Sequence, residues 1–542
     1  MDLITILLTL VVACVLFVLV FSEGYNIKTL LESLLPLLDT TDNSEVIKEN
    51  VAFALEKFGT TPRPKWSEMP EVTLCGILMT INSHEKQLYE LMFEIITSEA
   101  THLKSLKVLD DVFAKSEEFS SNEPGKCVLT KQERREIFSN IDDICKTSER
   151  FLSDLVSCWR KSIKLPDICD IITKHAKKNF SCYVDYCRNK EYQIRTETAL
   201  KQKPDYLNAL ALLESHEDCT SRSFASFLIL PVQRIPRLEM LVEDICKRVD
   251  KIDDEKRRKS DPLANETSSI RKSAMLAKKA LNKVATQSND AIRRMQQTEQ
   301  MIKLDKQIDF PSKMAKIPLI SESKQTHLVK QGDVKKIINE VNKRISIGSQ
   351  KPVQKTRHIL LLSDVLLITK KKGDRYKVED YCQRNKLVIE EIDNVDIYTR
   401  VLPLGVPSGC SNRFLLVMLE NCEKRQVEEV YACDSANDRA CWIEVLTPLK
   451  ITENEEIYAD WDCPQVECKL RYTAQKPGEL ALKQSDIVKV FKKCKNGMYE
   501  GKRIRDGESG LFPSNHTVEI ENDHVIARNM RMKYKQMSAT EN

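Results

Sequence analysis

Residues 227–245 read FLILPVQRIPRLEMLVEDI, and this stretch decides the fold of the larger part of the chain. Its apolar residues recur at steps of three and four, which predicts one buried face of an amphipathic helix. That face comprises Phe227, Leu230, Ile235, Leu238, Leu241, Val242 and Ile245. Pro231 and Pro236 cannot donate a backbone hydrogen bond, so we expect them to kink or interrupt the helix.

The sequence on either side of this stretch predicts further helices. Apolar residues recur at the same spacing from Leu88 to Phe113, and comparable patterns cover residues 131–155, 167–187 and 268–306. Helices of this length and polarity pack side by side and bury their apolar faces. We therefore expect an elongated all-α helical bundle, too long for its width to be a simple four-helix globule.

One carboxylate in the first of these helices has an unusual position. Glu99 lies three residues after Ile96 and four before Leu103, so its side chain is expected at the edge of the apolar stripe. A salt bridge at the helix edge is the ordinary explanation of such a glutamate. The alternative is a functional carboxylate on the bundle surface.

Three blocks of the helical region resemble those of a Dbl-homology domain, the exchange module of guanine-nucleotide exchange factors for Rho-family GTPases. They are ELMFEIITSEATHLKSLKVL (residues 90–109), FSNIDDICKTSERFLSDL (138–155) and the stretch at 227–245. Three shorter segments narrow the resemblance to the ephexin subfamily: WSEMPEV (66–72), YQIRTETAL (192–200) and ARNMRM (527–532).

The resemblance implies which residues of the bundle bind the GTPase. Glu99 matches the glutamate that engages the first switch segment in this family, whereas Arg237 and Asn289 match positions near the second switch. Gln233 and Arg234 belong to the same motif, and bracing of the helix is the structural alternative for Arg234. Exchange of nucleotide requires no covalent chemistry, and the sequence contains no P-loop, nucleophile elbow or kinase signature.

After the bundle, residues 327–448 change to short β-type runs such as RHILLLSDVLLIT, followed by a helix that contains Trp442. This order resembles a pleckstrin-homology domain, a PH-type β-barrel with a C-terminal helix, in which a tryptophan plugs the barrel. Basic side chains near its first strands could contact anionic lipid, and an ordinary solvated barrel edge explains them equally well. They are Lys330, Lys335, Lys336, Lys355 and Arg357.

Residues 468–521 resemble an SH3 domain, a small β-barrel that binds proline-rich helices on an aromatic surface. The peptide-binding positions are Tyr472, Glu479, Met498, Tyr499, Pro513 and His516. Met498 stands where the family has a tryptophan, and His516 where it has a tyrosine. Because the largest flat ring is missing, we expect weak or absent binding of PxxP peptides.

The N-terminus carries an uncharged run, LITILLTLVVACVLFVLVF, at residues 3–21. As a helix it would be about 28 Å long, close to the roughly 30 Å hydrocarbon core of a bilayer. Asp2 precedes the run and Lys28 follows it, which favours a single retained transmembrane helix with the remaining domains in the cytoplasm. An uncleaved signal peptide, or a segment absent from the true protein, is the alternative; in the latter case the protein is cytoplasmic.

Composition limits the remaining possibilities. The formal net charge of +4 over 542 residues lacks the strong basic excess of nucleic-acid-binding proteins. The 18 cysteines are scattered without CxxC pairs, which favours reduced thiols in a cytosolic protein and argues against zinc sites. We therefore expect neither a metal nor a cofactor.

Together these patterns predict a multidomain α+β protein with a Rho-family GTPase as partner. The expected segments are a transmembrane anchor (3–21), a flexible linker (22–84), a Dbl-homology domain (85–308), a pleckstrin-homology domain (325–450), an SH3-like domain (464–524) and a C-terminal tail (525–542). The favoured function is exchange of nucleotide on a Rho-family GTPase by a protein held at a membrane. The alternative is a degenerate scaffold that binds a GTPase without exchanging its nucleotide.

Overall fold

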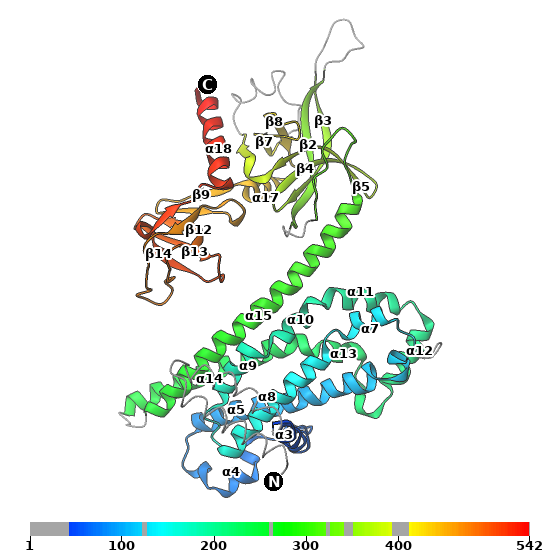
Figure 1. The fold of residues 1–542 in the computed structure, drawn as a ribbon, viewed down its shortest axis with the longest axis vertical. Coiled ribbons are helices and arrows are strands. Elements are labelled where there is room, and N and C mark those ends of the chain that lie inside the picture. The colour runs from blue at the N-terminus through cyan, green and yellow to red at the C-terminus, as the bar shows by residue number, and fades with distance from the viewer. Residues whose placement is uncertain are drawn as a thin grey trace, which may run out of the picture. The chain divides into compact units, whose positions relative to one another are not determined.

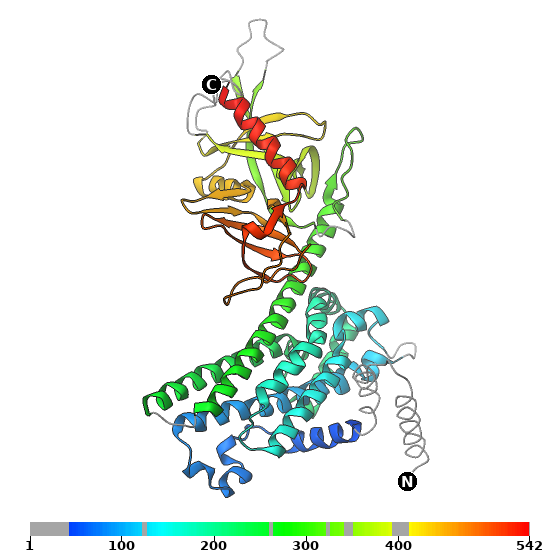
Figure 2. The same ribbon diagram turned by 60° about the vertical axis from the view of Figure 1, so that its left-hand side comes forward.

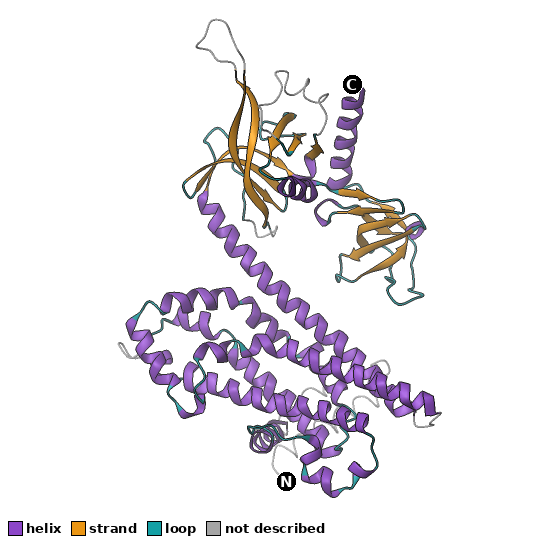
Figure 3. Cartoon of the chain, turned by 180° about the vertical axis from the view of Figure 1, so that it is seen from behind, coloured by secondary structure: helices purple, strands orange, loops and turns teal. Residues whose placement is uncertain are grey.

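A computed structural model of the chain describes residues 43–121, 127–259, 264–320, 326–340, 351–392 and 411–540. The chain divides into two compact units, Met1–Met295 and Gln296–Asn542. The described part of the first unit is helical, whereas the strands lie in the second (Figure 1; Figure 3). The predicted change from helices to strands after the bundle is therefore present.

The first unit is built from long helices joined by short turns. Its longer elements are α3 (Asn43–Lys57), α5 (Ser83–Val108), α7 (Lys131–Phe138), α8 (Ile141–Lys161), α9 (Ile168–Lys178), α10 (Ser181–Arg188), α11 (Lys190–Leu200), α12 (Pro204–Glu214) and α14 (Leu230–Lys259), with α15 (Ala264–Gln307) continuing into the second unit. The short helices are α4 (Pro70–Leu74), α6 (Glu117–Ser120) and α13 (Phe224–Leu228), and α5 continues into a π-helical turn, Leu109–Ala114.

Three helix boundaries differ from the sequence prediction. The helix expected at 131–155 is divided between α7 and α8, because Ser139 has a left-handed backbone with φ of 52°. The helix expected at 167–187 is likewise divided, at Asn179 and Phe180, into α9 and α10. The stretch at 227–245 is divided as well, at Ile229, into α13 and α14. Helix α14 includes Pro231 in its first turn, where a missing N–H costs little, and Pro236 in its interior.

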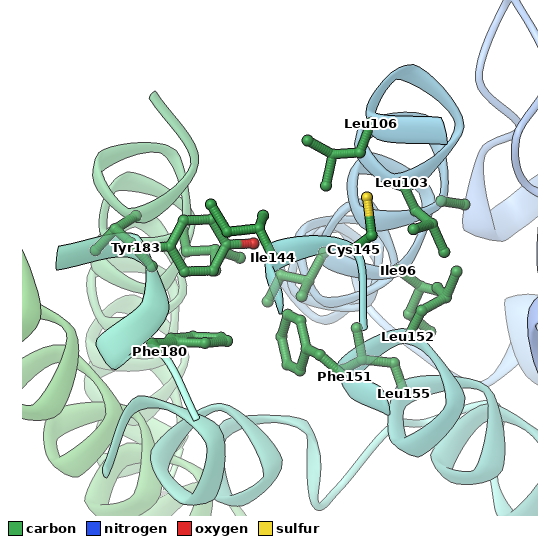
Figure 4. Packing of buried hydrophobic residues seen from close by; sticks show 14 of the residues in the cluster. Ile96, Leu103, Leu106, Ile144, Cys145, Phe151, Leu152, Leu155, Phe180 and Tyr183 are labelled. Carbon is green, nitrogen blue, oxygen red and sulfur yellow. The ribbon is translucent and has the colours of Figure 1, made fainter. Parts of the chain in front are cut away.

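The core of the first unit draws its side chains from helices that are distant in sequence. Figure 4 shows part of it: Leu103 and Leu106 from α5, Ile144 and Leu152 from α8, and Tyr183 from α10. Cross-packing of this kind fixes α5 against its neighbours, which matters because α5 carries the first candidate site residue.

Part of the segment expected to be a flexible linker belongs to this core. Val51 and Phe58, on and after α3, are buried, and so is Trp66, whose indole N–H donates to the carbonyl of Ile163 at 2.8 Å. The carboxylate of Glu90 accepts hydrogen bonds from the backbone of Trp66 at 2.7 Å and of the next residue at 3.0 Å. The bundle therefore packs against chain that lies before residue 85.

The predicted fold class was wrong in its single N-terminal transmembrane helix. Within the described ranges of the chain, no helix is both long enough and apolar enough to cross a bilayer. The run at residues 3–21, which prompted the prediction, lies outside the described residues.

The second unit contains two sheets. The first has strand order β1-β5-β4-β3-β2-β8-β7-β6. Its strands are β1 (Ile308–Asp309), β2 (Leu328–Glu340), β3 (Lys351–Leu362), β4 (Val365–Lys372), β5 (Arg375–Gln383), β6 (Leu387–Glu391), β7 (Arg413–Met418) and β8 (Val427–Ala432). Apart from the parallel pair β1–β5, neighbouring strands are antiparallel.

A helix closes the inner face of this sheet. Helix α17 (Ala436–Leu446) carries Trp442, which is fully buried among residues such as Val334, Ile359 and Phe414. The tryptophan therefore lies at the centre of this core, where the sequence pattern placed it. Its ring is also contacted by the Lys330 ammonium, 4.8 Å from the ring centroid.

The second sheet has strand order β14-β13-β12-β10-β9, with β11 paired to both β12 and β15. The strands are β9 (Leu449–Ile451), β10 (Glu455–Tyr458), β11 (Gln465–Cys468), β12 (Ile487–Cys494), β13 (Met498–Arg503), β14 (Ser509–Pro513) and β15 (Thr517–Glu519). Its core comprises Val466, Cys468, Leu480, Leu482, Val488, Val490 and Phe512.

The C-terminal segment, expected to be a tail, forms helix α18 (Asp523–Thr540). Figure 2 shows it (red) alongside the first sheet, where Tyr534 and Met530 pack onto the apolar outer side of strands β6, β7 and β8. Its Arg531 bonds to the carbonyl of Asn385 and to the buried carboxylate of Asp462. His524 reaches the same carboxylate at 2.9 Å, so the helix is tied to both sheets of this unit.

Candidate functional site

The candidate site begins on α5, whose start is fixed by a reciprocal capping box. The side chain of Asn82 accepts hydrogen bonds from the backbone of His84 and Glu85 at 2.9 Å, and the Glu85 carboxylate accepts from the backbone of Asn82 at 3.1 Å. This cap fixes the first turn of a 26-residue helix. The helix then carries Glu94 and Glu99 at defined positions along its length.

Glu99 is fully buried, whereas the sequence pattern placed it at the edge of the apolar stripe. One carboxylate oxygen pairs with Nη2 of Arg234 at 2.5 Å, and the other accepts a hydrogen bond from the hydroxyl of Ser148. Arg234 is itself buried, and its Nη1 donates to Ser98 at 3.2 Å. The network therefore joins α5, α8 and α14 beneath the surface.

The buried pair of Glu99 and Arg234 contributes to shifts in the pKa of two neighbouring side chains. Burial, with the nearby Glu99 carboxylate, raises the pKa of Tyr183 well above its usual value. Burial, with the nearby Arg234 guanidinium, holds the pKa of His102 well below its usual value, so the imidazole stays neutral at physiological pH. These two neighbours of the ionic pair, Tyr183 and His102, are thus held in their neutral forms.

The other residues predicted to bind a GTPase are exposed. Arg237 is half exposed and pairs with Glu94 on α5 at 2.6 Å. Gln233 and Asn289 face solvent on α14 and α15. Helices α14 and α15 run antiparallel, and the side chain of Asn282 on α15 donates a hydrogen bond to Glu239 on α14. Asn289 lies seven residues after Asn282, so it lies beside the residue seven positions before Glu239, which is Val232.

A cavity of about 1130 Å³ opens between α5 and α14. Its walls include Ser98, Thr101 and His102 from α5, Gln233, Arg234 and Arg237 from α14, and Gly59, Thr61 and Arg63 from the segment after α3. Burial lowers the pKa of Arg63, and the nearby cations Arg237 and Arg234 lower it further against the effect of Glu94. The structure thus brings four of the five predicted residues, all but Asn289, to this cavity or directly beneath it.

This arrangement is suited to binding a polar protein surface. Rigid helices fix its polar groups, so little side-chain entropy is lost when a partner docks. Within the described residues, no group of three histidine, cysteine, aspartate or glutamate side chains is placed to hold a metal ion. The geometry therefore provides a polar surface that lies above a buried ionic network.

The sequence reasoning missed two residues of this arrangement. Ser148, which binds Glu99, continues the stripe of Ile141, Ile144 and Cys145 at helical spacing, so a polar residue at a core position was the available signal. Glu94, the partner of Arg237, gave no comparable signal because the two come from separate blocks of sequence.

The basic residues predicted to contact lipid are paired with carboxylates. Lys330 pairs with Asp438 at 2.9 Å and Lys335 with Asp434 at 2.6 Å, and Lys336 pairs with Glu429. Arg357 pairs with Glu379 at 2.5 Å, and Lys355 also has an interaction partner. Four of the five predicted residues thus have a carboxylate partner, which weakens the prediction of lipid binding.

Four of the predicted peptide-binding side chains of the second sheet form one strip: Tyr472, Met498, Pro513 and His516. Tyr499 follows Met498 on β13 and so points to the other face of the sheet, where its ring packs against Phe512. The rings of Tyr472 and His516 meet edge to face with centroids 5.4 Å apart, and Met498 pairs with Pro513 across β13 and β14. Glu479 fixes one end of the strip, because its carboxylate accepts a hydrogen bond from the Tyr472 hydroxyl at 2.7 Å.

Comparison with protein families identifies two regions of the chain. Residues 91–289 match the RhoGEF domain, and residues 469–520 match the variant SH3 domain. The first match contains the five residues of the candidate site and the three helical blocks, except for the first residue of the first block. The second contains the strip.

Comparison with characterised proteins gives long alignments. The chain is 34% identical to mouse ephexin-1 over 469 residues, which are 86% of this chain and 61% of that protein. It is 33% identical to human Rho guanine nucleotide exchange factor 26 (86% of this chain, 51% of that protein) and to human Rho guanine nucleotide exchange factor 16 (91% and 66%). The chain thus spans between half and two thirds of the length of these relatives.

Solved structures share the fold at lower identity. The DH/PH domains of p115-RhoGEF align with a TM-score of 0.51 at 16% identity, covering 71% of this chain and 98% of that chain. The DH/PH fragment of PDZ-RhoGEF, solved in complex with human RhoA, aligns with a TM-score of 0.50 at 16% identity and the same coverage. At these identities the likeness concerns the fold.

Proposed function

Because this chain belongs to the Dbl family of RhoGEF-domain proteins, and within it to the ephexin subfamily with DH, PH and SH3 modules, we propose that it is a guanine-nucleotide exchange factor for a Rho-family GTPase. The carrying observation is the match of residues 91–289 to the RhoGEF domain, within alignments of 33–34% identity over more than four fifths of the chain. The GTPase partner is inferred from the RhoA complex of the PDZ-RhoGEF DH/PH fragment.

The proposed reaction is non-covalent. A GTPase holds its nucleotide through the P-loop, a Mg²⁺ ion and ordered switch segments. A surface that binds the nucleotide-free, rearranged state more tightly than the loaded state lowers nucleotide affinity by linkage. A thousandfold acceleration of release requires about 4 kcal/mol of differential stabilisation of the transition state for release.

We assign the five predicted residues two kinds of role. Gln233, Arg237 and Asn289 are exposed and contact the switch segments directly. Glu99 and Arg234 act as positioning residues, since their buried pair fixes α5 against α14 and thereby sets the exposed groups in place. For Glu99, this proposal replaces the direct contact with the first switch that the family resemblance implied.

The domain limits remain proposals: 85–308 for the Dbl-homology domain, 325–450 for the pleckstrin-homology domain and 464–524 for the SH3-like domain. Two observations support them. The RhoGEF and SH3 matches fall inside the first and third, and the strands of the first sheet from β2 to β8 with α17 fall inside the second.

The test is release of a fluorescent GDP analogue from Rho, Rac and their close relatives, measured with the full chain. Wild type should accelerate release from at least one of them. Arg237→Ala and Asn289→Ala should each slow this release by about tenfold, the size of effect seen when one exposed interface contact is lost. Arg150→Ala, an exposed arginine on α8, is the matched control and should leave the rate unchanged.

A second function, a GTPase-binding scaffold without exchange activity, is favoured by one observation: Glu99 is buried and paired with Arg234 within the protein. Under this alternative, nucleotide-free GTPase would bind the immobilised chain while release of the nucleotide stayed at its intrinsic rate. Acceleration by wild type that is lost in the Arg237 and Asn289 variants would reject the scaffold. Absence of acceleration on every GTPase tested would reject the exchange factor.

A further inference from the structure

The positive charge of the chain is concentrated in its SH3-like region. Residues 469–520 contain eleven lysine and arginine residues against six aspartate and glutamate residues, a formal charge of +5. The whole chain carries only +4, so the other 490 residues together are slightly acidic. A charge of this size on about 50 residues strongly biases which partners can approach.

Five of the six acids of this region pair with groups of the protein itself. Besides binding the Tyr472 hydroxyl, Glu479 accepts hydrogen bonds from the backbone N–H groups of Gln475 at 2.6 Å and Lys476 at 3.1 Å. Asp486 is buried and pairs with Arg505 at 3.2 Å. Glu479 therefore cannot serve as the free carboxylate that would select a basic residue in a proline-rich ligand.

The surplus cations flank the strip on two sides. Lys476 follows the turn that Glu479 binds, and Arg471 directly precedes Tyr472, so both lie at the tyrosine end. Lys495 lies in the turn whose Gly497 carbonyl accepts a hydrogen bond from the backbone N–H of Ser514, next to Pro513. All three are exposed, and among the residues that the structure describes none of them pairs with a carboxylate.

The side chains of the strip between these cations also favour a negatively charged ligand over a proline-rich helix. Met498 replaces the flat ring against which a proline-rich helix would pack. The half-buried side chains that remain can receive apolar groups of a ligand.

From this charge distribution we propose that the SH3-like region binds an extended acidic peptide, with its apolar side chains on the strip and its carboxylates against Arg471, Lys476 and Lys495. A strip of apolar side chains bracketed by cations matches an extended chain in which acidic and apolar residues alternate. A flat anionic membrane would use the charges but not the strip between them. The proposal concerns a surface outside the GTPase-binding site and does not depend on exchange activity.

The experiment measures fluorescence anisotropy of two labelled decapeptides with the full chain. One repeats glutamate, proline and leucine, and the other has arginine in place of each glutamate. The acidic peptide should bind, and its affinity should fall as salt is raised from 50 to 300 mM, because exposed charge pairs are screened. The double variant Lys476→Glu with Lys495→Glu should weaken binding by about tenfold or more, given up to about 1 kcal/mol per exposed pair.

A matched control is Lys316→Glu, which changes the charge of an exposed lysine outside the SH3-like region and should leave peptide affinity unchanged. Circular dichroism of each variant checks that the fold is retained. Equal or tighter binding of the arginine peptide, no binding of either peptide, or unchanged affinity in the double variant would each overturn the proposal. So would displacement of the acidic peptide by phosphatidylserine vesicles but not by unlabelled peptide.

Discussion

The buried pair of Glu99 and Arg234 allows a quantitative prediction about the helical unit. Removing either charge alone, by Glu99→Leu or Arg234→Met, leaves the other one buried and unpaired. Replacing both leaves two apolar side chains of similar volume. We therefore expect each single variant to be much less stable than the double variant.

The magnitude follows from burial. The side chains of Glu99 and Arg234 are only 1% and 4% exposed, so the remaining charge cannot be solvated without opening the bundle. Breaking a buried ion pair from one side costs about 3–5 kcal/mol. The double variant avoids this penalty and loses mainly two hydrogen bonds, from Ser148 to Glu99 and from Arg234 to Ser98, each worth about 1 kcal/mol.

The assay is differential scanning calorimetry of the full chain, with hydrogen exchange of peptides from α5 and α14 to assign the transition. A loss of 3–5 kcal/mol corresponds to a fall in Tm of about 6–20 °C for a unit of this size, whereas the Tm of the double variant should fall by about 4–8 °C. Arg150→Met, an exposed arginine on α8, controls for the loss of a charge. If the effects of the two single variants simply add in the double variant, the pair does not form the desolvated network described.

Three further predictions concern other contacts. Trp442→Ala should destabilise the first sheet by about 3–5 kcal/mol, because the fully buried indole is lost from its core. Thermal unfolding monitored by hydrogen exchange should show the loss in the first sheet and not in the helical unit. Asp462→Asn should weaken the attachment of α18, because Arg531 loses its buried carboxylate partner, so limited proteolysis should cut the C-terminal helix faster than in wild type. Acidification should destabilise the helical unit partly through Asp154: burial opposes its ionisation, but hydrogen bonds from His175 and a neighbouring lysine outweigh it and lower its pKa. A carboxylate whose pKa is lower in the folded than in the unfolded state stabilises the fold above the unfolded pKa, about 4. This stability is lost as the pH falls through the folded pKa. In urea unfolding, Asp154→Asn should therefore lose less stability than wild type between pH 5 and pH 3.

The helical and β-rich regions were predictable because their apolar periodicities are long. The stretch at 227–245 buries Phe227, Ile235, Leu238 and Val242, all on the predicted face. The positions at which predicted helices are divided depend on the backbone conformation of single residues. Nothing in the sequence distinguished Ser139, with its left-handed backbone, from an ordinary helical serine.

The candidate site was predictable in its membership but not in its geometry. The spacing of Glu99 from Ile96 and Leu103 allows both an edge position and a buried one. Burial is decided by Arg234 and Ser148, which come from other helices, and a helical pattern contains no information about such partners. The ion pairs of Lys330 and Lys336 could not be predicted for the same reason, because their carboxylate partners lie about 100 residues away in the sequence.

The attachment of α18 has a practical consequence for dissecting this protein. A truncation after residue 520 would remove Met530 and Tyr534, and so uncover the apolar side chains of β6, β7 and β8 to solvent. A gain or loss of exchange activity in such a truncated protein would then reflect aggregation or misfolding of the neighbouring sheet as much as relief from regulation. Point substitutions on the strip, which leave the helix docked, separate these two effects.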